Sequence, residues 1–168
     1  MNEAKLDPII SIGTLAEKVG LSVSAIRKYE EEGLIISFRA ESGHRLFCYE
    51  DIDRINTIQY LIKDIGLNFE GIRRMQALLP CWDILPCNPN ERDNCPALRE
   101  RSKSCWMLKY SPCTSQGNIC RECTVYRIGT LYLEEIKLFL HNPSGTFAPD
   151  VALKQHLNNN RHKRKEEK

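Results

Sequence analysis

The 168-residue sequence contains no run of about eighteen apolar residues, which is the length that a helix needs to cross a bilayer. Its first eight residues hold no apolar segment of the kind that directs secretion. The sequence also lacks a glycine-rich phosphate loop, a nucleophile elbow and the His/Glu helix motif of zinc hydrolases. We therefore expect a cytoplasmic protein that makes no membrane contact and is not an enzyme.

An excess of charge of one sign is missing as well, because 24 Lys and Arg residues stand against 22 Asp and Glu residues, for a formal net charge of +2. This balance neither favours nor excludes a nucleic-acid partner, since binding depends on whether basic side chains gather on one face. With 42% hydrophobic and 27% charged residues, the composition is that of a globular protein with one domain or two small ones.

Cysteine, by contrast, is abundant: there are eight, and seven of them lie between Cys81 and Cys123. In a protein without an export signal, such a cluster indicates metal or redox chemistry before it indicates a disulfide scaffold. The stretch from Pro80 to Cys123 also contains five prolines and shows no helical periodicity. So short and irregular a segment needs a cross-link of some kind in order to fold.

The first eighty residues show the periodicity of short helices. Helices are predicted over 12–19 and 22–32, with Ser22 as the N-cap of the second. Gly33 suits the left-handed position that follows a helix C-terminus. Two short helices joined by a tight turn predict a helix-turn-helix.

A hairpin and two more helices are predicted to follow. The β-type runs 34–38 and 45–48 flank a turn at 41–43. Apolar stripes then predict a third helix and, after the cap residue Asn68, a fourth. The inward-facing residues of these two helices are predicted to be Ile52, Ile55, Ile58, Ile62, Ile65, Phe69, Ile72, Met75 and Leu79.

Three segments in this order, Ile12–Ala16, Ser24–Leu34 and Ser42–Phe47, resemble the MerR family of bacterial transcription regulators. The resemblance extends from about Ser11 to Leu79, under half of the chain. It implies a mainly α fold with a small β-hairpin, in which residues 1–80 form a winged helix-turn-helix domain. It also implies a homodimer that binds double-stranded promoter DNA and acts on RNA polymerase indirectly, by distorting the promoter.

The candidate DNA-contacting residues lie on three elements. The outward side of the second helix can enter a major groove, and basic residues of the hairpin suit flanking phosphates. The resemblance implies a second phosphate-gripping element on the exposed side of the fourth helix, whereas the acidic run 30–32 is expected to face away. Taken singly, each basic residue could instead be solvated surface or part of an ion pair. The full set is Ser24, Arg27, Lys28 and Tyr29 on the helix, Arg39, His44 and Arg45 on the hairpin, and Arg73 and Arg74 on the fourth helix.

The cysteine-rich module, residues 81–123, resembles small bacterial modules with paired Cys-Trp motifs that occur fused to signalling proteins. Its chemistry allows a four-thiolate zinc site, an iron–sulfur cluster or reversible disulfides. The odd number and wide spacing of the cysteines favour an iron–sulfur cluster over zinc. Cys48, far from the others, is expected to be a small buried residue. The candidate metal ligands are Cys81, Cys87, Cys95, Cys105, Cys113, Cys120 and Cys123.

A last helix is predicted within 124–142, from Val125 to His141, and a polar basic tail covers 143–168. This helix either pairs with a second copy of the chain or packs on its own cysteine-rich module. We expect a sequence-specific DNA-binding regulator whose cysteine-rich half senses metal, redox state or another signal, with Cys81 close enough to the fourth helix to transmit a change. The alternative is an interaction or redox protein, with a cluster or zinc, whose helix-turn-helix no longer binds DNA.

Overall fold

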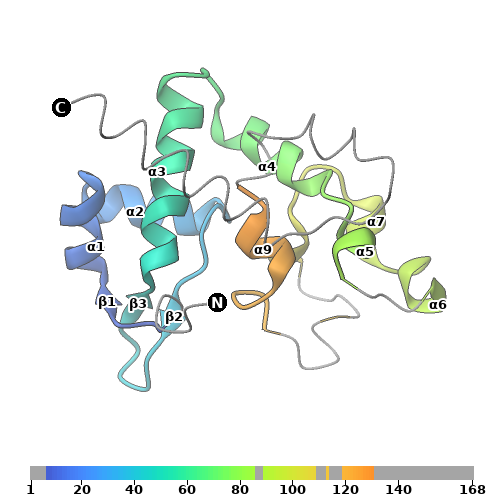
Figure 1. The fold of residues 1–168 in the computed structure, drawn as a ribbon, viewed down its shortest axis with the longest axis horizontal. Helices are drawn as coiled ribbons and strands as arrows, with labels where there is room; N and C mark the ends of the chain where they lie inside the picture. Colours follow the sequence, from blue (N-terminus) through green and yellow to red (C-terminus); the bar gives the residue numbers. More distant parts are fainter. Residues whose placement is uncertain (1–6, 86–88, 109–112, 114–118, 131–168) are drawn as a thin grey trace.

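The computed structural model describes residues 7–85, 89–108, 113 and 119–130. Within these ranges the chain is mainly helical with a small antiparallel sheet, as the sequence predicts, and no helix there is long and apolar enough to span a bilayer. Figure 1 shows the first half, in blue to teal, beside the segment from α5 onward, in green to orange. The elements in chain order are β1 (Ile10–Ser11), α1 (Ile12–Val19), α2 (Val23–Glu31), β2 (Phe38–Arg39), β3 (Arg45–Phe47), α3 (Tyr49–Lys63), α4 (Phe69–Ala77), α5 (Cys81–Ile84), α6 (Pro89–Arg92), α7 (Pro96–Arg99), η2 (Cys105–Met107) and α9 (Thr124–Ile128).

Polar side chains set the starts of α1, α2 and α4. Ser11, Ser22 and Asn68 each accept a hydrogen bond from the backbone N–H three residues further on, at 3.2, 3.1 and 2.8 Å. These bonds satisfy N–H groups that have no partner inside the helix. Gly33 has a φ angle of 70° just beyond α2, which confirms its predicted left-handed conformation.

The sheet has the strand order β1-β3-β2, and both strand pairs are antiparallel. We call β2, β3 and their turn the wing, and residues 33–37 the α2–β2 linker. The hairpin is confirmed, but the predicted strand 34–38 is shortened, because only Phe38–Arg39 pairs with β3. Leu34 and Ile35 are buried, so their apolar character reflects packing of the linker into the core. The two-residue strand β1 was not predicted, since it is too short to show alternation.

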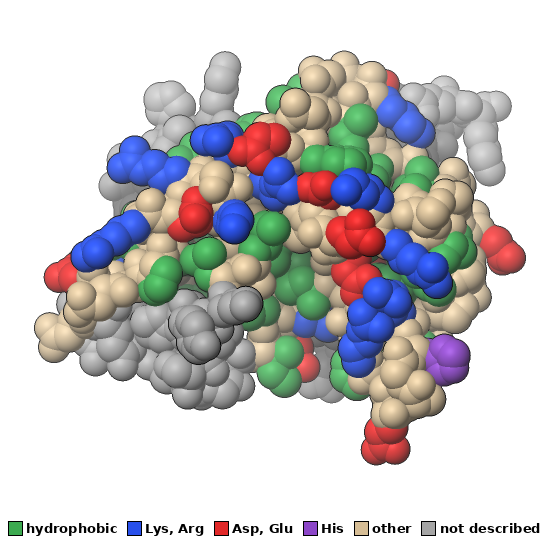
Figure 2. Space-filling view, turned by 180° about the vertical axis from the view of Figure 1, so that it is seen from behind, with side chains coloured by type: hydrophobic (Ala, Val, Ile, Leu, Met, Phe, Trp, Pro, Cys, Tyr) green, Lys and Arg blue, Asp and Glu red, His purple; other side chains and the backbone are tan. Residues whose placement is uncertain are grey.

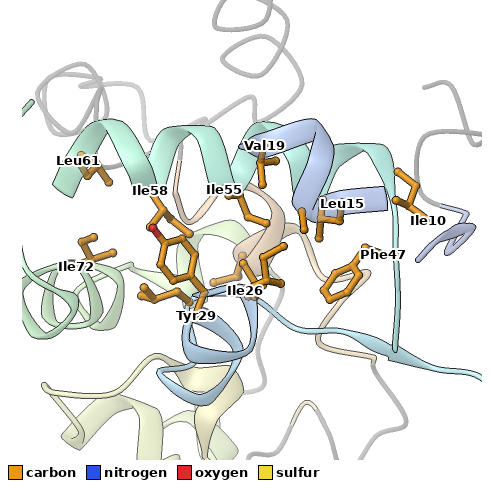
Figure 3. Packing of buried hydrophobic residues seen from close by; sticks show 14 of the residues in the cluster. Ile10, Leu15, Val19, Ile26, Tyr29, Phe47, Ile55, Ile58, Leu61 and Ile72 are labelled. Carbon is orange, nitrogen blue, oxygen red and sulfur yellow. The ribbon is translucent and has the colours of Figure 1, made fainter. Parts of the chain in front are cut away.

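The hydrophobic core lies where α1, α2, α3 and α4 converge (Figure 3). Ile26, Ile55, Ile58 and Ile72 are all completely buried, and burial of such a side chain contributes about 1.5–3 kcal/mol. One predicted core position is wrong: Ile65 is 54% exposed, because α3 ends at Lys63 and the chain turns before Ile65.

The segment after the cysteines returns to the first half of the chain. Val125 and Leu79 belong to the same core cluster, and α9 packs against α5. The helix predicted from Val125 to His141 is helical over Thr124–Ile128 and continues as a turn at 129–130. Its remaining residues, like the tail 143–168, lie outside the described residues, so its role in dimerisation stays a prediction.

Candidate nucleic-acid interface and cysteine-lined cavity

The outward face of α2 carries three of the predicted DNA-contacting residues, Ser24, Arg27 and Lys28, and all three are exposed. Lys28 forms an ion pair with Glu32 at 2.8 Å, yet its side chain keeps 52% of its surface. Tyr29 is different: it is only 7% exposed, and its ring lies edge-on to Phe69, with centroids 5.5 Å apart. The structure therefore places Tyr29 in the core, because it follows Ile26 by three residues on the inward side of the helix.

The wing is tied to α2 by Glu30. Its carboxylate accepts hydrogen bonds from Arg45 Nε, at 2.5 Å, and from the Ser37 hydroxyl, and it lies 3.7 Å from Arg39 Nη2. Burial opposes ionisation of Glu30, but the bonds from Ser37 and Arg45 outweigh it and lower the pKa of this carboxyl. The expectation that the whole acidic run faces away is thus wrong for Glu30, which fixes the wing against α2.

The exposed part of the wing carries Arg39 and His44. The Arg39 side chain retains 54% of its surface, and His44 is exposed at the turn, so both are placed to meet an approaching phosphate. Arg45 retains 29% and is shared between solvent and Glu30. Arg45 is therefore both a candidate phosphate contact and a part of the wing's own support.

The two arginines predicted to lie on the exposed side of α4 differ in their surroundings. Arg73 pairs with Glu32 of the α2 end and with Glu70, and its side chain is only 21% exposed. Arg74 pairs with Glu70 at 2.6 Å and keeps 59% of its surface. The expectation of full exposure is thus wrong for Arg73, which ties α4 to α2, whereas Arg74 points outward.

Charges of both signs share the surface seen from behind the molecule. Figure 2 shows Lys and Arg side chains interspersed with Asp and Glu side chains rather than a continuous basic patch. This agrees with the near-neutral composition and with the ion pairs described above. Contact with an anionic partner therefore depends on the few cations that project from α2, the wing and α4.

The cysteine-rich half touches the N-terminal half at the end of α2. Trp106 Nε1 donates a hydrogen bond to the carbonyl oxygen of Gly33, 2.7 Å away. The positive φ of Gly33 would strain any other residue, and a side chain there would also displace the flexible side chain of Met107. Gly33 thus ends α2 and lies against η2.

Tyr126 of α9 holds the next part of the linker. Its hydroxyl accepts a hydrogen bond from the Ile36 N–H at 2.8 Å. Burial raises the pKa of the Tyr126 hydroxyl to about 12, so the group stays neutral and able to bond at ordinary pH. Arg121 also binds the linker, because its guanidinium donates hydrogen bonds to the Ile36 carbonyl at 3.1 Å and to Asp51 of α3 at 2.9 Å.

Arg54 of α3 is a buried cation between the two halves. Its Nε donates to the Leu34 carbonyl at 2.7 Å, and its Nη1 donates to the Tyr126 carbonyl at 2.5 Å. The guanidinium carbon lies 3.9 Å from the centre of the Tyr126 ring and 5.4 Å from that of Trp106. These contacts offset part of the cost of burying the charge, because aromatic faces and carbonyl oxygens attract a cation. Burial still lowers the pKa of Arg54, and its Nη2 is buried without a hydrogen-bond partner among the described residues.

Among the candidate metal ligands, Cys105, Cys113, Cys120 and Cys123 line one cavity of about 330 Å³, which the rings of Trp106 and Tyr126 also wall. Burial, and next the neighbouring Cys81 and Cys123, raise the pKa of the Cys105 thiol well above its ordinary value. Within the described ranges no set of His, Cys, Asp and Glu side chains is already spaced to hold a metal ion.

Cys81 and Cys95 do not line the cavity. Cys81 is nevertheless a neighbour of Cys105, and both pack against the hydrophobic core. Cys95 precedes α7 as its N-cap. Cys87 lies outside the described residues. Cys48 is 3% exposed at the start of α3, which confirms that it is a small buried residue.

No pattern in the sequence indicates the contacts between the two halves of the chain. Arg54 and Tyr126 are 72 residues apart, and Trp106 and Gly33 are 73 residues apart. The Asp51 and Arg54 positions on a helix face that otherwise carries isoleucines could have suggested a buried polar group. They could not have named its partners.

The fold and its outward basic residues define residues 10–79 as a helix-turn-helix unit with a wing. The same residues match the family model described as MerR HTH family regulatory protein, so this segment is a MerR-family helix-turn-helix domain. The cysteine-rich segment lies beyond the match. The family description denotes regulators, not enzymes.

Three relatives are similar to between 30% and 44% of this chain. The HTH-type transcriptional regulator GlnR of Bacillus anthracis is 37% identical over 68 residues, which are 40% of this chain and 52% of that protein. The HTH-type transcriptional regulator TnrA of Bacillus subtilis is 44% identical over 50 residues, 30% of this chain and 46% of that protein. The nodulation protein NolA of Bradyrhizobium elkanii is 36% identical over 76 residues, 44% of this chain and 34% of that protein. The chain thus spans about half the length, or less, of the relatives it matches.

Proposed function

We propose that this chain is a sequence-specific, DNA-binding transcriptional regulator. The observation that carries the proposal is the outward face of α2, where Ser24, Arg27 and Lys28 are exposed beside a wing that Glu30 ties to the same helix. Such a helix fits a major groove, and exposed cations beside it fit the phosphates. The match of residues 10–79 to a family of regulators supports the same conclusion.

The chain acts as a homodimer on double-stranded promoter DNA. One recognition helix reads only a half-site, and a two-fold pair of helices reads an inverted repeat. It acts on RNA polymerase indirectly, through the shape of the promoter DNA. A dimer of fixed geometry favours one promoter shape over others.

The cysteine-rich half is the sensing part, and the signal is a metal or the redox state, with an iron–sulfur cluster favoured over zinc. Support comes from the α2–β2 linker, which Trp106, Arg121 and Tyr126 hold at three points. A shift of these side chains would move the recognition helix and the wing together. Coupling free energies between two sites are typically about 1–3 kcal/mol.

The test is selection of DNA from a random-sequence pool by the purified full chain, followed by anisotropy titrations at several salt concentrations. The expected result is an enriched inverted repeat, whose binding constant falls linearly with salt on a double-logarithmic plot. If no sequence is enriched by a folded protein, the proposal is wrong. A folded chain that carries a metal centre but enriches no DNA would point instead to an interaction or redox protein.

A further inference from the structure

The cysteine-lined cavity gathers residues from three separate parts of the cysteine-rich half. Cys105 begins η2, Cys120 and Cys123 lie at the two ends of a turn before α9, and Cys113 comes from between them. The Cys123 N–H donates to the Cys120 carbonyl at 3.2 Å, which fixes the turn. Residues 18 positions apart in the sequence therefore present thiols to one space.

The size of this space indicates the size of its occupant. The cavity measures about 330 Å³, many times the roughly 10–15 Å³ of cavity volume that one water molecule needs. A single ion would leave most of it unfilled, whereas a group of several metal and sulfide atoms would not. Trp106 and Tyr126 wall the cavity, and such rings reduce the solvent exposure that helps to set the reduction potential of an iron–sulfur cluster.

We propose that Cys105, Cys113, Cys120 and Cys123 are the four ligands of one iron–sulfur cluster held in this cavity. The proposal deepens the sensing role given above and rests on it only for its regulatory meaning. Each cysteine binds as a thiolate. Loading from a preassembled cluster is a ligand exchange, in which four iron–thiolate bonds to small thiols break and four to cysteine sulfurs form. The cysteine protons pass to the departing thiolates, and no electron is transferred.

The contacts of the cavity wall extend to the recognition helix. Trp106 bonds to Gly33, and Tyr126 bonds to Ile36, so the two rings beside the cluster are the ones that hold the α2–β2 linker. Arg54 lies against the faces of both rings. A cluster in the cavity would therefore contact the same side chains that hold the α2–β2 linker.

The experiment uses the full chain, loaded anaerobically with a four-iron, four-sulfide cluster ligated by a small thiol and then freed of excess reagent. Iron, acid-labile sulfide and visible absorption are measured. The variants Cys105→Ser, Cys113→Ser, Cys120→Ser and Cys123→Ser are each expected to lose most of the bound iron and sulfide. The matched control is Cys95→Ser, because Cys95 does not line the cavity and serine is a favourable N-cap for α7. This control is expected to load like wild type.

A second measurement keeps the test independent of how well the variants fold. Wild-type protein is alkylated with iodoacetamide before and after loading, and each cysteine is followed by mass spectrometry. Loading should slow alkylation at the four proposed ligands and leave Cys95 unchanged. Equal alkylation of any one of the four in both states would overturn the ligand set. Retention of zinc but not of iron and sulfide, at the same cysteines, would overturn the occupant.

The outcome is separable from that of the DNA experiment. A chain that holds the cluster through these four cysteines but enriches no DNA sequence refutes the proposed function and leaves the cluster assignment standing. A chain that selects DNA but loads no cluster refutes the cluster assignment and leaves the proposed function standing.

Discussion

Trp106 donates its indole N–H to the carbonyl oxygen of Gly33, the residue that ends the recognition helix, over 2.7 Å. The same indole forms part of the wall of the cysteine-lined cavity. One side chain therefore spans the distance between the proposed sensing site and α2. The sequence suggested transmission through Cys81 and the fourth helix, and the contact at Gly33 adds a more direct route.

Replacing Arg27 or Arg45 by alanine should weaken binding to the selected DNA by about 1–3 kcal/mol each, if each loses a good base or phosphate contact. Arg45→Ala also removes a partner of Glu30, so its effect should include some loss of stability. Anisotropy titrations at one salt concentration measure the affinities, and urea unfolding checks the fold. The control is Lys63→Ala, an exposed cation at the end of α3 far from the wing. Wild-type affinity in both arginine variants would contradict the assignment of α2 and the wing.

Glu30→Gln should weaken DNA binding although it removes a negative charge. The amide cannot form the ion pairs with Arg45 and Arg39, so the wing should lose its fixed position beside α2. Glu31→Gln changes the charge equally, but its side chain is 70% exposed and lies 3.9 Å from Lys28. That control should bind DNA as tightly as wild type or slightly more tightly. Tighter binding by both variants would mean that Glu30 acts only through its charge.

Trp106→Phe keeps an aromatic ring but removes the bond to Gly33. We expect the free energy of unfolding to fall by about 0.5–1.5 kcal/mol, the usual net contribution of one hydrogen bond. The difference in DNA affinity between cluster-loaded and cluster-free protein should also shrink. Trp82→Phe on α5 is the control, because Trp82 is 36% exposed. An undiminished difference in the Trp106 variant would show that the signal follows another path.

Tyr126 should make the protein sensitive to alkali. Its pKa is about 12 in the folded chain and 10.0 ordinarily, so the unfolded state releases this proton first as the pH rises. The folded state then holds more protons than the unfolded state, and stability should decline between pH 10 and 12, by up to about 1.4 kcal/mol per pH unit. Below pH 10 the contribution is fully present.

Tyr126→Phe supplies the comparison. It should be less stable than wild type at pH 8, because the Ile36 N–H loses its acceptor. The gap should narrow above pH 10 in urea unfolding followed at a series of pH values. Parallel pH profiles for the two proteins would show that Tyr126 does not govern the alkaline decline.

Local features of the fold could be predicted from the sequence because their causes lie within a few residues. Ser22 and Asn68 cap the helices that they were expected to cap, and Gly33 adopts its left-handed conformation. The side of a helix on which a residue lies is harder to predict. The resemblance places Tyr29 among the DNA-contacting residues, although its spacing of three from Ile26 puts it on the inward side of α2.

Contacts between residues far apart in the sequence could not be predicted, because the residues around one member of such a pair do not indicate the other member. Arg73 was expected to be exposed, but it faces Glu32, 41 residues away. The spacing of the seven clustered cysteines sets Cys120 and Cys123 apart as a close pair but does not indicate which others join them. The folded chain brings Cys105 to the turn that carries this pair.

The burial of Arg54 beneath Tyr126 has a consequence for how the protein is made. Residues 10–79 include every position that matches the regulator family, yet Arg54 finds one of its two carbonyl acceptors at Tyr126, and Val125 completes the core beside Leu79. A chain that ended at residue 80 would keep the Arg54 charge but lose the Tyr126 carbonyl and ring that pack against it. On the ribosome, the DNA-binding half can form its helices early, but its packing is finished only after α9 has emerged.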